Sequence, residues 1–349
     1  LTRRAGQAEL PSVSVVDLRQ ELREGNRSML SRSLREAIEE RLSSGEQVML
    51  FLNRRGYAGF VSCRSCGHVL TCPHCAVSLS LHRGGKLVCH YCGYEQPAVK
   101  NCPRCGSGFI RTFRAGTQQV EEELQREFPR ARVLRMDLDT TRGKEDHQKI
   151  LSAFAGHEAD ILVGTQMIVK GHDFPDVTLV GALAADLSLH IPDYRAAERT
   201  FQLLTQAAGR AGRGKSRGLV IIQTYDPDHY AVQAAAAQDY ESFYEQEMNY
   251  RALAGYPPAG GLFAIHCSGP DEAYLKLACG YLKKFIQQAG ITVLGPADEA
   301  VSRIQDQYRM VIYLKHENIG MLTEIKNRIE RYVAVNHGFD QVAMQFDIN

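Results

Sequence analysis

The chain has 349 residues, of which 44% are hydrophobic and 23% charged, and its formal net charge at pH 7 is +1. This composition excludes collagen-like and intrinsically disordered chains, and the length predicts two or three domains. The longest apolar runs, 177–185 and 219–225, are much shorter than the roughly 20 residues that a membrane span requires. We therefore expect a cytoplasmic protein without a membrane partner. The start lacks both Met and an apolar signal core, so we also expect a fragment of a longer protein.

Short β-branched runs alternate with amphipathic stretches from residue 12 to residue 240. This alternation predicts a mostly parallel sheet with helices on both faces. The strands are expected at 13–16, 47–52, 132–136, 160–163, 178–183 and 218–224, and the helices at 30–43, 117–127, 144–154, 195–207 and 229–238.

A cysteine-rich insertion interrupts the alternation after the second strand. Eight of the ten cysteines form four C-x-x-C pairs there, and residues 53–115 carry nine Lys/Arg against a single acid, Glu95. Each pair can supply half of a tetrahedral zinc site, and a closed set of four thiolates leaves no position for a catalytic water. The insertion is therefore predicted to hold two structural zinc ions, and its basic charge favours contact with nucleic acid.

Two pairings of these cysteines are possible. We favour nested sites, because an insertion must return close to its point of departure and an outer site would join its two ends; consecutive pairing is the alternative. The nested sites would be Cys63, Cys66, Cys102 and Cys105 for the outer one, and Cys72, Cys75, Cys89 and Cys92 for the inner one.

A Gly/Pro-rich segment at 255–261 marks a second boundary. The pattern that follows predicts a βαββαβ domain with strands at 262–267, 291–294, 301–314 and 340–347 and helices at 271–289 and 317–335. We thus divide the chain into a linker (1–11), a first domain (12–240) with the zinc-binding insertion (58–112), and a C-terminal domain (241–349).

Residues 209–216 match the phosphate-loop pattern G-x-x-x-x-G-K-[ST]. A phosphate loop leaves a strand and enters a helix, whereas this segment follows an expected helix and precedes an expected strand. A nucleotide kinase built on this segment would require tight ATP binding that is lost on Lys215→Ala, and we expect no such loss.

The same region, read as Q-A-A-G-R-A-G-R over 206–213, resembles motif VI of superfamily 2 helicases, and G-T-Q-M-I-V-K-G-H-D-F-P over 164–175 resembles motif V. With L-N-R-R-G-Y (52–57), the four cysteine pairs and G-T-Q-Q-V-E-E-E-L (116–124), the chain resembles the PriA family of bacterial primosomal replication-restart DNA helicases. Y-P-P (256–258), L-G-P (294–296) and the final D-I-N (347–349) fit the C-terminal domain of that family.

The resemblance implies the RecA-like second motor lobe of a 3′ to 5′ helicase that acts at abandoned replication forks. ATP and Mg²⁺ would be bound mainly by a first lobe that is absent, so the fragment alone is expected to lack ATPase activity. The implied partners are forked and single-stranded DNA, single-stranded DNA-binding protein and other primosome proteins. The alternative is a non-catalytic zinc-ribbon module that binds nucleic acid or protein.

The resemblance also assigns roles to individual residues. Arg210 and Arg213 would be arginine fingers that stabilise the transferring γ-phosphoryl group, as such arginines do in phosphoryl-transfer sites. The catalytic group is Gln206, Arg210 and Arg213; the nucleotide-binding residues are Gly171 and Asp173; and the DNA-binding residues are Thr165, Lys170, Arg54 and Arg55.

Overall fold

The computed structural model describes most of the chain. The described residues are 10–52, 61–74, 77–82, 85–112, 116–137, 140–141, 143, 145–168, 173–191, 193–214 and 217–349.

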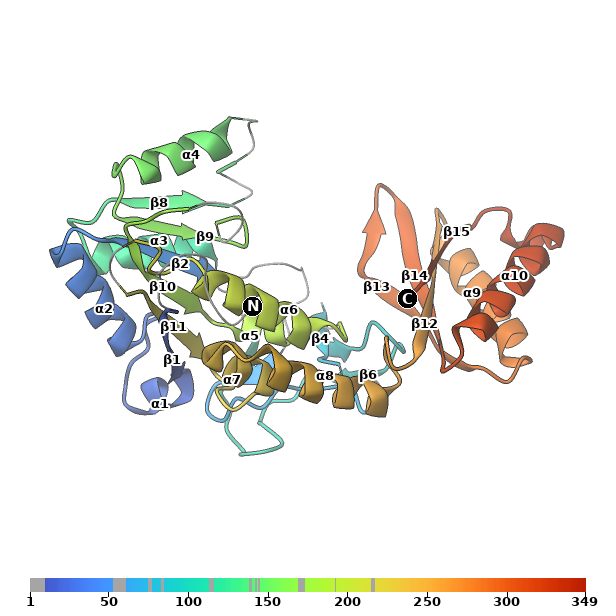
Figure 1. The fold of residues 1–349 in the computed structure, drawn as a ribbon. Helices are drawn as coiled ribbons and strands as arrows, with labels where there is room; N and C mark the ends of the chain where they lie inside the picture. Colours follow the sequence, from blue (N-terminus) through green and yellow to red (C-terminus); the bar gives the residue numbers. More distant parts are fainter. Residues whose placement is uncertain are drawn as a thin grey trace.

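A six-stranded sheet forms the centre of the first domain (12–240), for which we keep the name motor lobe that the family resemblance implies (Figure 1). All of its neighbouring strands pair in parallel, as the alternating pattern predicts. The second strand along the chain, Gln47–Leu52, is buried at every position, which is why the residues after Gln47, VMLFL, are continuously apolar rather than alternating. The sheet order is β1 (Ser12–Asp17), β11 (Leu219–Thr224), β10 (Val177–Leu183), β2 (Gln47–Leu52), β9 (Ile161–Gly164) and β8 (Val133–Met136).

Helices cover both faces of this sheet and form a separate core on each side. α2 begins at Arg32 rather than at residue 30, because the Ser31 side chain caps it by accepting a hydrogen bond from the Leu34 amide. One face carries α2 (Arg32–Ser43) and α3 (Thr117–Glu127), and the other carries α4 (Asp146–Ala155), α6 (Ala196–Ala208) and α7 (Tyr230–Ala237). The short helices α1 (Leu18–Arg23) and α5 (Asp186–Leu189) follow β1 and β10.

The cysteine-rich insertion leaves the lobe after β2 and returns before α3. Its two ends are joined by antiparallel pairing of β3 (Val61–Cys63) with β7 (Ile110–Thr112). Between them lies a three-stranded antiparallel sheet of β4 (Ser80–His82), β5 (Lys86–Val88) and β6 (Glu95–Pro97). We call residues 61–112 the zinc module.

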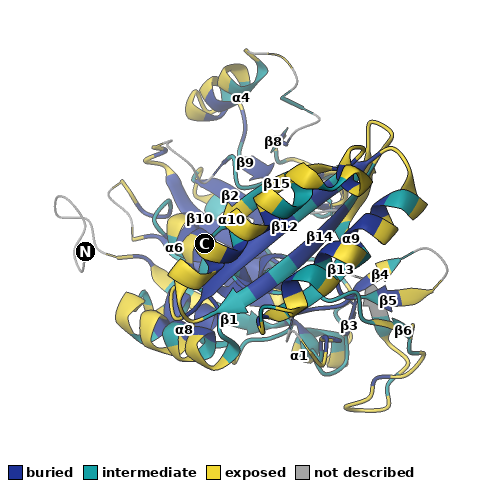
Figure 2. Cartoon of the chain, turned by 90° about the vertical axis from the view of Figure 1, so that its right-hand side faces the viewer, coloured by how far each residue is buried: buried dark blue, intermediate teal, exposed yellow. Residues whose placement is uncertain are grey.

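The C-terminal domain has the predicted βαββαβ order. Its sheet is antiparallel, in the order β13-β14-β12-β15, and both long helices pack on one face of it, leaving their outer sides exposed (Figure 2). The elements are β12 (Gly261–Gly269), α9 (Glu272–Gln287), β13 (Thr292–Ile304), β14 (Gln307–His316), α10 (Ile319–Val335), the 3₁₀ helix η1 (His337–Phe339) and β15 (Ala343–Ile348).

The expected strand 301–314 is wrong as a single element. Gln305 and Asp306 have φ angles of 48° and 60°, and this left-handed pair turns the chain back between β13 and β14. The apolar and β-branched residues on both sides hid the turn, because neither turn residue is glycine or asparagine.

Helix α8 (Tyr240–Ala254) connects the two domains (Figure 1). Phe243 near its start belongs to the core of the motor lobe and stacks on Phe201 of α6, with ring centroids 4.2 Å apart. The helix ends at Gly255, whose φ of 64° stops it just before the C-terminal domain. Among the described residues, no helix combines the length and the apolar character needed to cross a bilayer.

Candidate functional site

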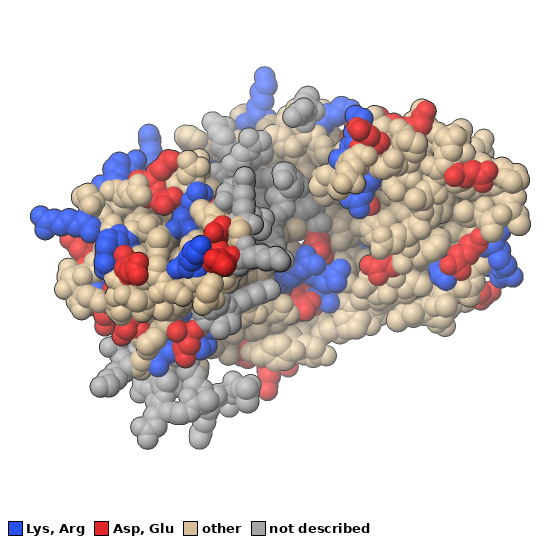
Figure 3. Space-filling view, turned by 90° about the horizontal axis from the view of Figure 1, so that it is seen from above, with Lys and Arg blue, Asp and Glu red and all other residues tan. Residues whose placement is uncertain are grey.

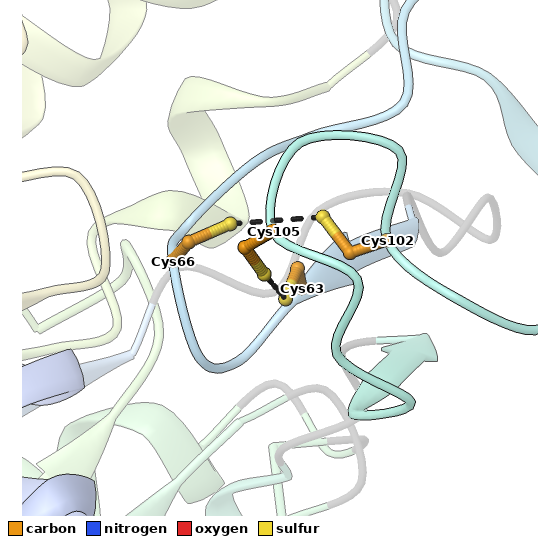
Figure 4. A group of neighbouring side chains, drawn as sticks. All are labelled: Cys63, Cys66, Cys102 and Cys105. Atoms are coloured by element: carbon orange, nitrogen blue, oxygen red, sulfur yellow. Dashed lines mark hydrogen bonds between the residues drawn. The ribbon is translucent and has the colours of Figure 1, made fainter.

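The four outer cysteines converge from the two ends of the zinc module (Figure 4). The Cys63 and Cys105 sulfurs lie 3.6 Å apart, and the Cys66 and Cys102 sulfurs 3.7 Å apart. All four sulfurs lie within 4.8 Å of one another. A tetrahedron with zinc–sulfur bonds of about 2.3 Å has edges of about 3.8 Å, whereas a disulfide requires about 2.05 Å. The geometry therefore fits one Zn²⁺ and no disulfide.

The local sequence explains how each turn presents its two sulfurs. In C-R-S-C-G, C-H-Y-C-G and C-P-R-C-G, the glycine after the second cysteine has φ of 76°, 78° and 72°. Each of these glycines donates its amide to the carbonyl of the first cysteine, at 2.8 or 2.9 Å. A side chain would be strained in this conformation, so the glycine lets the turn close around the metal position.

The inner cluster contains Cys72, Cys89 and Cys92, with the Cys72 and Cys92 sulfurs 3.6 Å apart. Cys75, the fourth expected member, lies outside the described residues. Cys72 and Cys89 are almost fully buried, at 2% and 0% exposure. The described sulfurs thus follow the nested arrangement, with the second cysteine pair meeting the third.

Electrostatics in the outer cluster favour a bound cation. Burial acts to raise the pKa of Cys63, but backbone hydrogen bonds from Cys66 and Ser65 outweigh it and bring that pKa down to about 7. Burial raises the pKa of Cys66 to about 12. Neighbouring sulfurs cannot all carry negative charge without a counter-ion, and a Zn²⁺ held by these four cysteines would supply the positive charge that lets every thiol ionise.

The loop after α6 carries the expected catalytic arginines. Arg213 donates from Nη1 to Asp173 Oδ1 at 3.2 Å and from Nε to the Gly209 carbonyl at 2.9 Å. Burial and the charge of Arg213 lower the pKa of Arg210, while Asp173 opposes this effect. The structure therefore brings Arg210, Arg213 and Asp173 together at the edge of the sheet where β10 and β11 begin.

Close backbone packing holds this loop in place. A Cβ on Gly212 would lie 2.1 Å from the Gly218 amide nitrogen, and one on Gly214 would lie 2.5 Å from the Pro175 carbonyl oxygen. Only glycine fits at these two positions. Gly214 is the second glycine of the phosphate-loop-like pattern, and here both glycines allow close packing between the loops before β10 and β11.

The other residues predicted to bind nucleotide or DNA, or to act in catalysis, lie on α6, after β9 or outside the described residues. Gln206 lies exposed in the last turn of α6. Thr165 follows β9 at the opposite edge of the sheet, where its amide donates to the Met136 carbonyl at 3.3 Å. Gly171, Lys170, Arg54 and Arg55 lie outside the described residues.

A group of four tyrosines, three of them buried and one partly buried, joins the zinc module to both domains, and sequence reasoning missed it. We call Tyr91, Tyr194, Tyr256 and Tyr313 the tyrosine cluster. Tyr91, from the inner C-H-Y-C turn, stacks on Tyr313 of β14 with centroids 4.7 Å apart and meets Tyr256 edge-on at 6.4 Å. Tyr256 stacks on Tyr194, just before α6, at 4.8 Å. The only sequence signal was an aromatic residue between two zinc-binding cysteines.

Cations complete the junction around the tyrosine cluster. Lys315 Nζ lies 3.4 Å from the centroid of Tyr256, a cation–π contact. Arg251 of α8 is 7% exposed and pairs with Glu247 at 2.7 Å and with Glu198 of α6 at 2.6 Å. The contacts of Arg251 fix α8 against the helix that leads to Arg210.

Charge on the molecular surface is mixed. Acidic and basic side chains are interspersed on the face seen in Figure 3, in keeping with the net charge of +1. Within the zinc module, Lys86 is paired with the single acid, Glu95, at 2.8 Å.

Comparison with known proteins identifies three regions of the chain. Residues 72–97 match the PriA DNA helicase Cys-rich region domain, residues 108–215 the helicase conserved C-terminal domain, and residues 252–349 the primosomal protein N C-terminal domain. Among solved structures, RecG bound to a three-way DNA junction aligns with 71% of this chain and with 23% of the RecG chain, at 14% identity and a TM-score of 0.37.

Curated relatives match along almost the whole chain. Replication restart protein PriA of Bacillus subtilis is 48% identical over 100% of this chain and 44% of the relative. The proteins of the same name from Synechocystis and Treponema pallidum are 45% and 41% identical, covering 90% and 93% of this chain and 39% and 49% of the relatives. The chain thus spans less than half the length of these relatives. It belongs to the PriA family of replication restart proteins.

Proposed function

We propose that this chain is the C-terminal half of an ATP-dependent 3′ to 5′ DNA helicase in replication restart, and that residues 12–240 are its second motor lobe. The observation that carries the proposal is the grouping of Arg210, Arg213 and Asp173 in one loop region at the edge of the sheet. Two guanidinium groups beside one carboxylate leave a net positive charge, which suits a site that receives a phosphate chain.

The division of labour follows from this placement. ATP and Mg²⁺ would be held mainly by a first lobe outside this chain, and Arg210 and Arg213 would contact the γ-phosphate across the cleft. Asp173 holds Arg213 in the absence of nucleotide, so nucleotide binding would exchange a carboxylate partner for a phosphate. Thr165, at the opposite edge, is available for the DNA strand, so closure of the lobes would couple the two edges.

Substitution of Arg213 in the full-length protein tests the finger assignment. Arg213→Ala should reduce DNA-stimulated ATP hydrolysis by about 10³-fold or more, the scale of a lost arginine finger. DNA affinity should stay within about 2-fold, because Arg213 lies away from the expected strand. Arg199→Ala is the matched control, since Arg199 lies on the preceding helix and pairs with Asp193 at 2.6 Å. Unchanged turnover in Arg213→Ala would refute the assignment.

Two structural zinc ions are part of the proposal. The outer site would be held by Cys63, Cys66, Cys102 and Cys105, and the inner by Cys72, Cys89 and Cys92 together with Cys75. Zinc supplies folding free energy to a module that has few large apolar residues. Metal analysis of the purified chain should give two zinc ions per molecule, and one or none would contradict the two-site proposal.

The substrates and partners proposed are forked and single-stranded DNA, single-stranded DNA-binding protein and other primosome proteins. The competing function is a non-catalytic zinc-ribbon module. DNA-stimulated ATPase activity separates the two, because the helicase proposal requires turnover by the full-length protein and negligible turnover by this chain alone.

A further inference from the structure

A cavity of about 200 Å³ lies at the edge of the motor-lobe sheet opposite Arg210 and Arg213. It is lined by residues at the carboxyl ends of three adjacent strands: Leu52 at the end of β2, Leu183 at the end of β10, and Tyr225 just after β11. Arg64 of the zinc module closes one side, so the cavity lies where the module meets the lobe.

The topology of the sheet places a crevice at this point. After β2 the chain passes through the zinc module to α3 on one face, whereas after β10 it passes through α5 to α6 on the other. The connections of these two neighbouring strands therefore diverge. Open parallel sheets bind ligands at such divergences, outside the carboxyl ends of the strands.

The residues that line the cavity can stack against a planar aromatic ring. Leu18, Met29, Leu52 and Leu183 give the cavity an apolar part, and the Arg64 guanidinium lies 4.8 Å from the centroid of the Tyr225 ring. Flat aromatic and guanidinium groups of this kind stack with nucleobases.

Backbone contacts hold Tyr225, which forms one wall of the cavity, in a fixed position. The Tyr225 amide donates to both carboxylate oxygens of Asp186, at 3.0 and 3.1 Å. A Cβ on Gly67 would lie 2.3 Å from the Tyr225 carbonyl oxygen, so the zinc module packs directly against this residue. A preformed wall reduces the ordering cost of binding.

The volume and charge of the cavity further limit which ligands it can bind. Pockets for drug-sized ligands measure about 300 to 1,000 Å³, so a cavity of about 200 Å³ suits a single base rather than a whole nucleoside triphosphate. Arg27, an exposed residue of the lining, adds a positive charge that can attract a DNA phosphate to the cavity.

We propose that this cavity receives one unpaired base of the DNA strand that the motor lobe tracks. The proposal rests on the proposed function, because Thr165 extends β9 at the same edge and β9 is paired with β2 through Phe51 and Gly164. Neighbouring strands lie about 4.8 Å apart, so a strand whose phosphate contacts Thr165 passes close to the cavity mouth.

Paired DNA probes test the base pocket in the full-length, zinc-loaded protein. A thymidine oligomer and an abasic oligomer of the same length carry the same phosphates and differ only in their bases. In Tyr225→Ala, affinity for the thymidine oligomer should fall by about 5-fold or more, the scale of one lost base–aromatic stack. Affinity for the abasic oligomer should not change. Tyr225→Phe should retain both affinities, and Tyr94→Ala, at a tyrosine that does not line the cavity, should behave as wild type.

Two further measurements do not depend on how well Tyr225→Ala folds. Arg27→Ala changes an exposed residue and should weaken binding of both oligomers equally, lowering the slope of log affinity against log salt by about 0.7. An oligomer with 5-iododeoxyuridine should photocrosslink to Tyr225 in the wild-type protein.

An unchanged thymidine-to-abasic ratio in folded Tyr225→Ala would overturn the proposal, as would crosslinks elsewhere only. It would also be overturned if Tyr225→Ala lost binding of an acidic peptide while keeping the ratio, since the cavity would then be a peptide site. Failure of the proposed function is separate, because it would appear as absent DNA-stimulated ATP hydrolysis in the wild-type protein.

Discussion

The outer and inner cysteine clusters share one chemistry but have different surroundings. The outer cluster lies at the stem of the zinc module, and Cys105 is exposed. The inner cluster is part of a core that also contains Tyr194 of the motor lobe and Leu262 of the C-terminal domain. The same metal site can thus close an insertion in one place and hold two domains together in another.

Cysteine substitutions should separate the two roles, and we expect the largest effect here. Cys89→Ser removes a fully buried inner ligand and should cost one zinc ion and a free energy on the order of 10 kcal/mol in the module, the scale seen for finger peptides. The link between the domains, 255–261, should become open to limited proteolysis. Cys105→Ser should also cost one zinc ion but leave this link protected, because the inner core is intact. Equal cleavage rates in both variants would contradict the contrast.

The tyrosine cluster offers a test that leaves both zinc sites in place. Tyr91→Ala removes a ring packed against Tyr313 and Tyr256 and should lower the free energy of unfolding by about 3 to 5 kcal/mol, as for other buried aromatic residues. Tyr91→Phe keeps the stack and loses only the acceptor for the Tyr194 amide, so its cost should be about 1 kcal/mol. Urea unfolding of zinc-replete protein measures both values.

Tyr94→Ala is the control for this substitution. Tyr94 lies two residues after Cys92 and is only partly buried, with its hydroxyl bonded to Gln96. If Tyr91→Ala costs no more than Tyr94→Ala, the tyrosine cluster does not secure the junction.

A smaller effect is the dependence of stability on pH through His229, a partly buried histidine of the motor lobe. Burial lowers the pKa of His229 to about 3, and His229 caps α7 by accepting the Ala231 amide at 3.2 Å. Above about pH 6.5 this histidine is neutral in both the folded and unfolded states. Below pH 6.5, His229 binds a proton in the unfolded chain but stays neutral in the folded chain. The free energy of unfolding therefore falls as the pH decreases from about 6.5 toward 3.

The free energy of unfolding should fall by about 1 kcal/mol over the first pH unit below 6.5. His229→Asn keeps a capping side chain and removes the titration, so it should flatten the stability profile between pH 6.5 and 4.5. His190, whose pKa burial lowers to about 4, remains in the variant and should leave a residual slope. An unchanged slope in His229→Asn would show that other groups control the acid response.

Local patterns in the sequence determined the fold class and the family. The alternation of β-branched runs with amphipathic stretches predicted a parallel sheet covered on both faces, and the C-x-x-C spacing predicted cysteines that act in pairs. These features depend on residues close in sequence, for which spacing and side-chain type are sufficient information.

Only the tertiary structure decided which distant residues meet. Tyr91 and Tyr313 stack although more than 200 residues separate them, Arg213 pairs with Asp173 from a different loop, and the cavity wall joins Arg64 to Tyr225. The hairpin turn at Gln305 and Asp306 was missed for a related reason: pairing of β13 with β14 places Gln305, a residue type that rarely adopts left-handed angles, at φ 48°. Contacts of this kind depend on how the sheet, the module and the C-terminal domain pack together, and no local pattern encodes that packing.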